Sequence, residues 1–242
     1  SIYRDKKNFN LYPDYVFENL KKNDLLNIGF EGLVIKIIKK TNDKIISEVI
    51  QSGKLENNKG VYLVNRKIKL NFLTQKDFAA INIAKKMKIK NFALSFTNDS
   101  SDIKKFNKLL PKENKFFKIE TKKALIQLNK IIPLGKNFLI DRGDLSNEVE
   151  TLMVPYYQRL IVKKMKKGNK NIFIATNFLE SMVNNPYPNR GEANDIFSCL
   201  EMGVDGLVLA GETAIGKYPI ECVLFLKKMI RNSFSKYNES KK

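Results

Sequence analysis

Hydrophobic residues make up 43% of the 242-residue chain, which is long enough to bury the core of one large domain or of a large and a small one. The chain has no histidine, which excludes histidine-based acid–base chemistry and histidine-ligated zinc. No apolar run of about 18 residues and no signal-peptide pattern is present, so we expect a cytoplasmic protein without a membrane span.

The formal net charge of +19 raises the question of nucleic-acid binding. The lysines are spread along the chain in pairs such as Lys39-Lys40, Lys104-Lys105 and Lys227-Lys228, without a dense basic arm or interleaved aromatic residues. We therefore expect solvated helix faces that attract small anions, and no nucleic-acid partner. Cys199 and Cys222 lie among apolar residues without a metal-ligand spacing, which predicts buried free thiols.

The N-terminal part of the chain has the pattern of a β-rich module. Short apolar stretches at 33–38, 44–50 and 61–64 are separated by turn signals such as TNDK and SGKLENNKG. We predict a small β-rich domain over residues 1–72.

From about residue 75 onward, short apolar segments alternate with helical patterns, which is typical of repeated βα units. Such continuous apolar strands indicate a parallel sheet buried on both faces. Residues 73–242 are therefore predicted to form a β/α barrel segment or an open doubly wound sheet. The predicted strands are 91–96, 116–120, 137–141, 171–176 and 206–210, with helices such as 102–110, 150–168, 192–203 and 219–230.

Polar side chains follow every predicted strand at its carboxyl end. In β/α barrels the active site is assembled at these ends, and although any one such residue could be an ordinary cap, their convergence predicts a site. These residues are Ser95; Lys118 and Glu120; Asp141, Arg142 and Asp144; Thr176 and Asn177; and Glu212 and Thr213.

Lys118 and Glu120 are two residues apart on a predicted strand, so their side chains point to the same side. A partly buried structural ion pair is one interpretation. The other is a shared site, in which Asp144 adds a second carboxylate and Gly143 lets the backbone approach a ligand. Two carboxylates without histidine or cysteine suit an oxygen-liganded Mg²⁺ or Mn²⁺.

A divalent metal beside a lysine is suited to stabilising negative charge on an enolate or on a phosphoryl group in transfer. The amides of Gly143 and Asp144, at the expected start of a helix, would be donors for a carboxylate or phosphate. Thr176 could add a hydroxyl, although a threonine at a strand end is more often a simple cap or strand former. The pattern favours an anionic substrate.

Several longer motifs carry a family resemblance. KIE at 118–120, RGDL at 142–145, ATNFLESMVNNPYPNRGEANDI at 175–196 and GETAIGKYPIE at 211–221 resemble consecutive strand ends of pyruvate kinase, in the same order and with similar spacing. SGKLENNKGVYL at 52–63 resembles the connection from that family's mobile β-rich domain. The resemblance covers nearly the whole chain. It implies an α/β fold comprising units four to eight of a TIM (β/α)8 barrel, with a small β-rich barrel domain at the N-terminus.

The resemblance also implies roles for the strand-end residues. Lys118 would stabilise the transferring phosphoryl group and the enolate, while Glu120 and Asp144 would hold Mg²⁺ or Mn²⁺. The family reaction moves phosphate from phosphoenolpyruvate to ADP and gives pyruvate and ATP, a step of glycolysis.

Substrate binding is implied in the same way. The amides of Gly143 and Asp144, together with Thr176, would bind the carboxylate of phosphoenolpyruvate or pyruvate, with Thr176 near the face where the proton is transferred. Lys59 matches the lysine that approaches the nucleotide phosphates from the small domain.

The chain also departs from the family pattern. Residues 146–150 lack the usual glycine and proline, and Asn98 replaces an arginine. Asp141 stands where a small residue is usual. Its additional carboxylate would either raise the pKa of a neighbouring carboxyl group or strengthen metal binding.

The first three βα units of the family barrel have no counterpart in this sequence, nor has the motif that binds nucleotide phosphate and a monovalent cation. We therefore expect K⁺ as a cofactor only where that segment is supplied. Five strands leave exposed edges, so a homo-oligomer or association with the missing barrel segment is expected.

Two other functions remain open beside the phosphotransferase. A metal-dependent lyase or aldolase acting on pyruvate enolate would reuse the same site without a nucleotide lysine, so Lys59 argues against it. A noncatalytic pyruvate-kinase-like subunit would account for Asn98 and for the altered residues 146–150.

Overall fold

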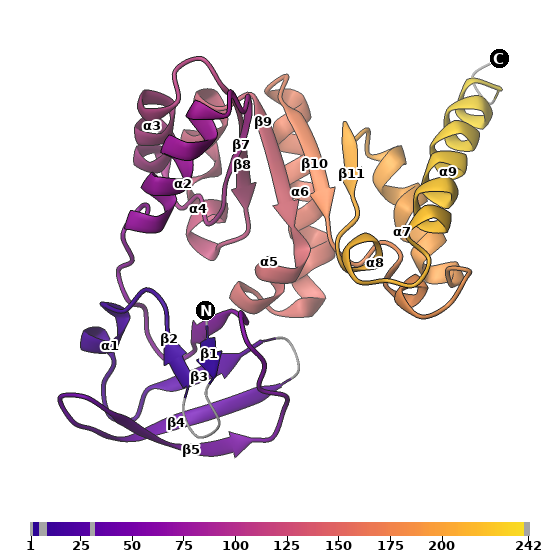
Figure 1. Cartoon of the computed structure of the whole chain (residues 1–242). Coiled ribbons are helices and arrows are strands. Elements are labelled where there is room, and N and C mark those ends of the chain that lie inside the picture. Colours follow the sequence, from indigo (N-terminus) through magenta and orange to yellow (C-terminus); the bar gives the residue numbers. More distant parts are fainter. Residues whose placement is uncertain (1, 5–8, 30–31, 240–242) are drawn as a thin grey trace. The chain divides into compact units, whose positions relative to one another are not determined.

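The computed structural model describes residues 2–4, 9–29 and 32–239. The chain divides into two compact units, Ser1–Lys86 and Met87–Lys242 (Figure 1). Helix α2 (Gln75–Lys86) falls in the first unit, and the domain boundary expected between residues 72 and 73 stays a prediction. In the part of the chain that the structure describes, no helix combines the length and apolarity needed to span a membrane.

The first unit contains antiparallel sheets. In its described residues, four strands pair in the order β5-β4-β3-β6, and β1 pairs with β2. Besides α2, its elements are β1 (Ile2–Arg4), β2 (Phe9–Leu11), α1 (Val16–Asn19), β3 (Leu25–Ile28), β4 (Leu33–Lys40), β5 (Ile45–Gln51) and β6 (Val61–Leu63).

The core of the first unit follows from the period-two pattern of its strands. Leu33, Ile35 and Ile37 alternate along β4 and are buried, whereas the residues between them are partly exposed. They pack with Leu26 and Ile28 of β3 in one cluster. Alternating side chains point to opposite faces of a strand, so this spacing places one apolar face inside.

The second unit is α/β with a parallel sheet, as predicted. Its described strands pair in sequence order, β7-β8-β9-β10-β11, and every pair is parallel. The strands are β7 (Asn91–Leu94), β8 (Asn114–Ile119), β9 (Asn137–Asp141), β10 (Asn171–Ala175) and β11 (Gly206–Val208). The α-helices are α3 (Ser100–Leu109), α4 (Lys122–Ile131), α5 (Arg142–Glu148), α6 (Val154–Lys167), α7 (Arg190–Glu201), α8 (Gly211–Ala214) and α9 (Pro219–Glu239), and the 3₁₀ turns are η1 (Ile132–Leu134), η2 (Thr151–Met153) and η3 (Glu180–Val183).

The predicted helix over residues 150–168 is divided in the structure. A 3₁₀ turn, η2, precedes α6, and Pro155 lies in the first turn of α6. Proline is favoured there because its missing N–H would have no partner inside the helix. The helix ends at Gly168, as the sequence predicts.

The two faces of the parallel sheet differ in burial, although continuous apolar strands by themselves indicate a sheet covered on both faces. Side chains on one face are fully buried, and α6 packs against β10. On the opposite face, Phe116 and Phe173 are half-buried and contact each other with ring centroids 5.3 Å apart. Lys118 lies on this half-covered face. The buried face carries Phe117, Ile119, Phe138, Ile140, Ile172 and Ile174.

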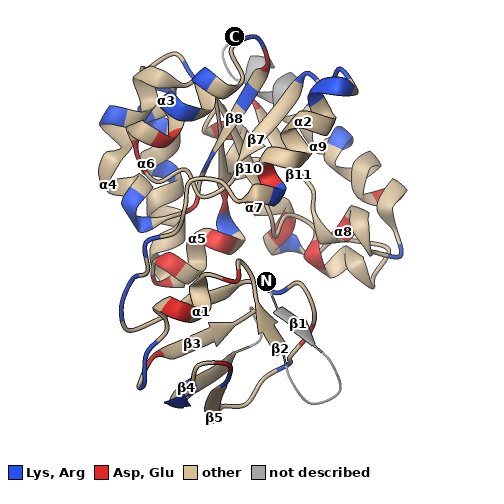
Figure 2. Cartoon of the chain, turned by 60° about the vertical axis from the view of Figure 1, so that its left-hand side comes forward, with Lys and Arg blue, Asp and Glu red and all other residues tan. Residues whose placement is uncertain are grey.

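The helices of the second unit are amphipathic, and their exposed sides carry many of the lysines that make the chain positively charged. Helix α6 buries Val154, Ile161, Val162 and Met165, while its lysines lie on the outer side. Lysine and arginine residues are spread over α3, α4 and α6 (Figure 2). Cys199 and Cys222 are buried and free, as predicted.

Replacing Phe138 by Ala should destabilise the second unit by about 3–5 kcal/mol, because Phe138 is fully buried against Phe117 and its removal leaves a cavity. Chemical unfolding followed by circular dichroism measures the loss. Tyr187→Ala, at a side chain that is 79% exposed, is the control and should change stability by less than about 0.5 kcal/mol. Equal effects would contradict the assigned core.

Candidate active site

The register of two parallel strands brings the acidic residues together. Ile119 of β8 pairs with Ile140 of β9, so Glu120 and Asp141 follow at neighbouring strand ends. Asp141 is also the N-cap of α5, and Asp144 lies in the first turn of that helix. The carboxyl ends of β8 and β9 therefore deliver three carboxylates to one place.

Lys118 lies among these carboxylates. Its Nζ is 2.9 Å from Asp141 Oδ2, 3.0 Å from Glu120 Oε2 and 3.8 Å from Asp144 Oδ2. Oxygen atoms of the three acidic residues lie within 4.8 Å of one another. We call Glu120, Asp141 and Asp144 the carboxylate cluster.

Glu120 is the most deeply placed member, with no exposed surface. Its Oε1 accepts a hydrogen bond of 2.6 Å from the backbone N–H of Phe96. Its Oε2 is also buried and has no hydrogen-bond partner of good geometry, although it makes the ion-pair contact with Lys118. Burial raises the pKa of Glu120 to about 7, against the opposing effects of the Lys118 charge and the Phe96 amide.

Lys118 remains charged in this position. Burial alone would lower its pKa, but the neighbouring carboxylates of Glu120 and Asp141 outweigh that effect, and the pKa of Lys118 is raised. A protonated ammonium is thus held near the carboxyl end of β8, and 18% of the Lys118 side chain is exposed. It can stabilise negative charge on a ligand that binds there.

The carboxylate cluster fits a hard divalent cation. It offers oxygen ligands without histidine or cysteine, which is the donor set that Mg²⁺ and Mn²⁺ prefer. The buried Glu120 Oε2, without a hydrogen bond of good geometry, is an oxygen that a cation would satisfy.

Gly143 and Thr176 meet across the ends of β9 and β10. The backbone N–H of Gly143 donates a 2.9 Å hydrogen bond to Thr176 Oγ1, and that hydroxyl donates to the carbonyl of Ala175 at 2.6 Å. The N–H of Asp144 points to Asp141 Oδ1, 3.5 Å away. Both predicted anion-binding amides thus lie at the site, and in this structure protein oxygens accept from them.

Thr176 adopts an unusual backbone conformation. Its φ is 73°, and Asn177 follows with φ 57°. A β-branched residue rarely adopts positive φ, and such conformations persist where the surroundings hold them. Asn177 donates a 2.5 Å hydrogen bond to Glu180 Oε2, which helps to hold the turn.

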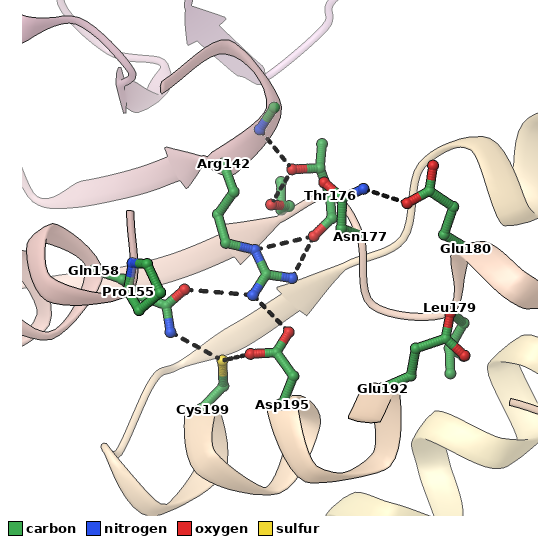
Figure 3. A network of polar contacts seen from close by, with 12 residues as sticks. Arg142, Pro155, Gln158, Thr176, Asn177, Leu179, Glu180, Glu192, Asp195 and Cys199 are labelled. Carbon is green, nitrogen blue, oxygen red and sulfur yellow. Dashed lines mark hydrogen bonds and ion pairs between the residues drawn. The ribbon is translucent and has the colours of Figure 1, made fainter. Parts of the chain in front are cut away.

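Arg142 holds the carbonyl of Thr176 (Figure 3). Its Nε and Nη2 both donate to that oxygen, the former at 3.1 Å. Its Nη1 lies 2.5 Å from Asp195 Oδ2 on α7 and 3.4 Å from Gln158 Oε1 on α6. The guanidinium also stacks over Phe178, 4.3 Å from the ring centroid. Arg142 therefore ties the Thr176 turn to two helices.

The other predicted polar residues lie elsewhere or have structural contacts. Lys59 belongs to the first unit, where its Nζ is 2.7 Å from Glu56. Glu212 is buried and accepts hydrogen bonds from the backbone amides of Leu179 and Ala210, so its contacts stabilise two loops. Ser95 is exposed.

Three contacts of the site were not predicted, because roles were assigned to single motifs. Asp141 was named among the strand-end residues and noted as an additional carboxylate, but no binding role was assigned to it, and its contact with Lys118 was not predicted. Arg142 had no assigned role, and its partner Asp195 lies on a later helix. The Phe96 amide carries no side-chain signal.

Comparison with known proteins decides the family. A family model described as pyruvate kinase, barrel domain, matches residues 4–223. The chain belongs to the pyruvate kinase family. The motifs KIE at 118–120 and RGDL at 142–145 contain Lys118, Glu120 and Asp144, and the motif at 175–196 contains the Thr176 turn.

Individual pyruvate kinases agree with this assignment. The pyruvate kinase of Thermotoga maritima is 33% identical over 223 residues, which are 90% of this chain and 48% of that protein. The pyruvate kinase of Methanocaldococcus jannaschii is 30% identical over 230 residues, 93% of this chain and 51% of that protein. The chain thus spans about half the length of these relatives.

Glu120→Gln should increase stability more at high pH than at low pH. A carboxyl with a raised pKa keeps its proton in the folded state while the unfolded state has lost it, so the stability of the native sequence falls as pH rises from 4.5 to about 7. The Gln variant has no ionisable group at this position, so its stability does not fall with pH in this way. Its melting temperature relative to the native sequence should therefore rise between about pH 5 and about pH 8, measured without divalent metal. A constant difference would contradict the buried carboxyl.

Asp195→Ala should destabilise the second unit by about 1–3 kcal/mol, because the guanidinium of Arg142 is 10% exposed and would lose its charged partner. Denaturant unfolding measures this. Lys123→Ala, which breaks an ion pair whose lysine is 54% exposed, is the control and should cost about 0–1 kcal/mol. If the two variants were equally stable, Arg142 would not depend on Asp195.

Proposed function

We propose that the chain carries the catalytic strand ends of a phosphotransferase that moves phosphate from phosphoenolpyruvate to ADP and gives pyruvate and ATP. The observation that carries this proposal is the ammonium of Lys118 among Glu120, Asp141 and Asp144, at the carboxyl edge of the parallel sheet. Family membership makes this chemistry the best-supported use of that arrangement.

For the fold, we propose that the second unit supplies units four to eight of a TIM (β/α)8 barrel and that the first unit contains the small β-rich lid domain. The half-covered face with Phe116, Lys118 and Phe173 supports this, because the inward face of a closed barrel is covered by the other strands. In this arrangement Lys118 and the carboxylate cluster lie at the barrel mouth.

Glu120 and Asp144 would hold Mg²⁺ or Mn²⁺. When bound, the metal would supply a Lewis acid that polarises substrate oxygens and offsets their negative charge. The chain's own residues account for the rest of the site. Lys118 would place its positive charge where negative charge develops on the phosphoryl oxygens and the enolate, and this contribution is strongest in the transition state.

The Thr176 turn would bind and orient the substrate carboxylate. The amides of Gly143 and Asp144 lie at the N-terminal end of α5 and would donate to it in place of their present protein acceptors. The Thr176 hydroxyl would lie beside the carbon that receives a proton. Lys59 of the first unit would approach the nucleotide phosphates.

A coupled assay on the full-length protein tests the proposal. With Mg²⁺ and K⁺ present, phosphoenolpyruvate should be consumed in an ADP-dependent manner, and pyruvate should form in equal amount. Absence of ADP-dependent turnover, in a folded protein that binds Mn²⁺, would contradict the proposed reaction.

Lys118→Met should lower kcat far more than it raises KM for phosphoenolpyruvate, because the ammonium contributes most where charge develops in the transition state. A loss of about 10²–10³-fold in kcat is expected, the magnitude found when one electrostatic stabiliser is removed. Steady-state kinetics on the full-length protein measures it. Lys123→Met, at an exposed residue of α4, is the matched control. Equal losses in kcat and affinity would assign Lys118 a structural role.

A further inference from the structure

Lys118 and a divalent cation would compete for the same oxygen atoms. Nζ lies 3.0 Å from Glu120 Oε2 and 3.8 Å from Asp144 Oδ2, and these are the residues proposed to hold the metal. An ammonium bound to both would oppose a second positive charge there. The site therefore needs a way to keep Lys118 close to the metal ligands without neutralising them.

Asp141 provides Lys118 with a carboxylate of its own. Its Oδ2 makes the shortest of the three contacts with Nζ, at 2.9 Å. Its Oδ1 faces the N–H of Asp144 as the N-cap of α5. Both oxygens of Asp141 thus face protein donors, whereas Glu120 Oε2 has no hydrogen bond of good geometry.

The backbone fixes Asp141 in this position. It is the last residue of β9 and the cap of the next helix, and the β8–β9 register places it beside the strand that carries Lys118. Its side chain is 15% exposed. A carboxylate held by a strand and a helix start is preorganised for its partner.

The charges of the carboxylate cluster, Lys118 and a divalent cation also balance. When ionised, the three carboxylates of the cluster carry one more negative charge than the two proposed metal ligands, and that additional charge matches the ammonium of Lys118. Glu120 and Asp144 then retain the two negative charges that match a divalent cation.

We infer that Asp141 is a positioning residue, which binds the ammonium of Lys118 and thereby leaves the carboxylates of Glu120 and Asp144 to a divalent cation. The inference rests on the proposed function for its metal. It concerns Asp141 acting through Lys118, and not Asp141 as a further metal ligand.

A double-mutant cycle of Mn²⁺ affinity separates these two roles. Asp141→Asn should weaken Mn²⁺ binding by about 10-fold, because Lys118 then turns to Glu120 and Asp144. In a Lys118→Met background, the same substitution should change the affinity by less than about 2-fold. Calorimetric or paramagnetic-resonance titration, without nucleotide or phosphoenolpyruvate, measures all four proteins.

Two results would overturn the inference. An equal loss of affinity in both backgrounds would make Asp141 a metal ligand or a general source of negative charge, and no loss in either would leave it without a role at the site. Glu201→Gln, at an exposed carboxylate of α7, is the matched control for charge and should have no effect.

Further variants keep the cycle interpretable. Should Asp141→Asn fail to fold, Asp141→Ser retains an N-cap oxygen without the charge and should give the same pattern. Glu120→Gln tests the proposed metal site separately. If it weakens Mn²⁺ binding while the cycle shows no coupling, the role of Asp141 is wrong and the proposed function stands; if it has no effect, the metal assignment fails and the inference fails with it.

Discussion

The buried carboxylate of Glu120 is the constraint on which the rest of the site depends. Removing a carboxylate from water is costly unless charges and hydrogen bonds nearby compensate for the lost hydration. Here the compensation comes from the Phe96 amide in the loop after β7 and from Lys118 near the end of β8. Both contacts require the carboxyl ends of β7, β8 and β9 to lie side by side, which the parallel register provides.

The two faces of the sheet differ in burial, and this difference positions the residues of the site. Fully buried residues such as Phe117 and Ile119 anchor β8 on the covered face, while Lys118, between them, points to the half-covered face. Helix α5 begins directly where β9 ends, so Asp141 and Asp144 enter from the same chain segment. Arg142 then ties this segment to the Thr176 turn and to Asp195 of α7. The site is thus built from strand ends whose positions are fixed by the core behind them.

Much of this organisation could be predicted from local sequence. Short continuous apolar segments located the five strands of the second unit, and the two-residue spacing placed Lys118 and Glu120 on the same side. The helical patterns between these segments indicated several of the helices. The family motifs then assigned roles to Lys118, Glu120 and Asp144, which the structure brings together, whereas Lys59 lies in the other unit.

The remaining features depend on contacts between distant segments. The pairing of Lys118 with Asp141 follows from the register of two strands, which local pattern alone does not determine. The positive φ of Thr176 is maintained by Arg142, and neither residue type favours such a turn by itself. The half-covered face does not follow from the strands themselves, because an apolar strand has the same sequence pattern whether or not a second layer covers it.

We propose that the carboxyl ends of β8 and β9 hold a divalent cation beside Lys118. Anomalous diffraction from crystals of the protein grown with Mn²⁺ tests it most directly. We expect a manganese peak within bonding distance of carboxylate oxygens of Glu120 and Asp144, with Lys118 Nζ turned toward Asp141. A fully occupied Mn²⁺ elsewhere, with Lys118 still bridging Glu120 and Asp144, would contradict it.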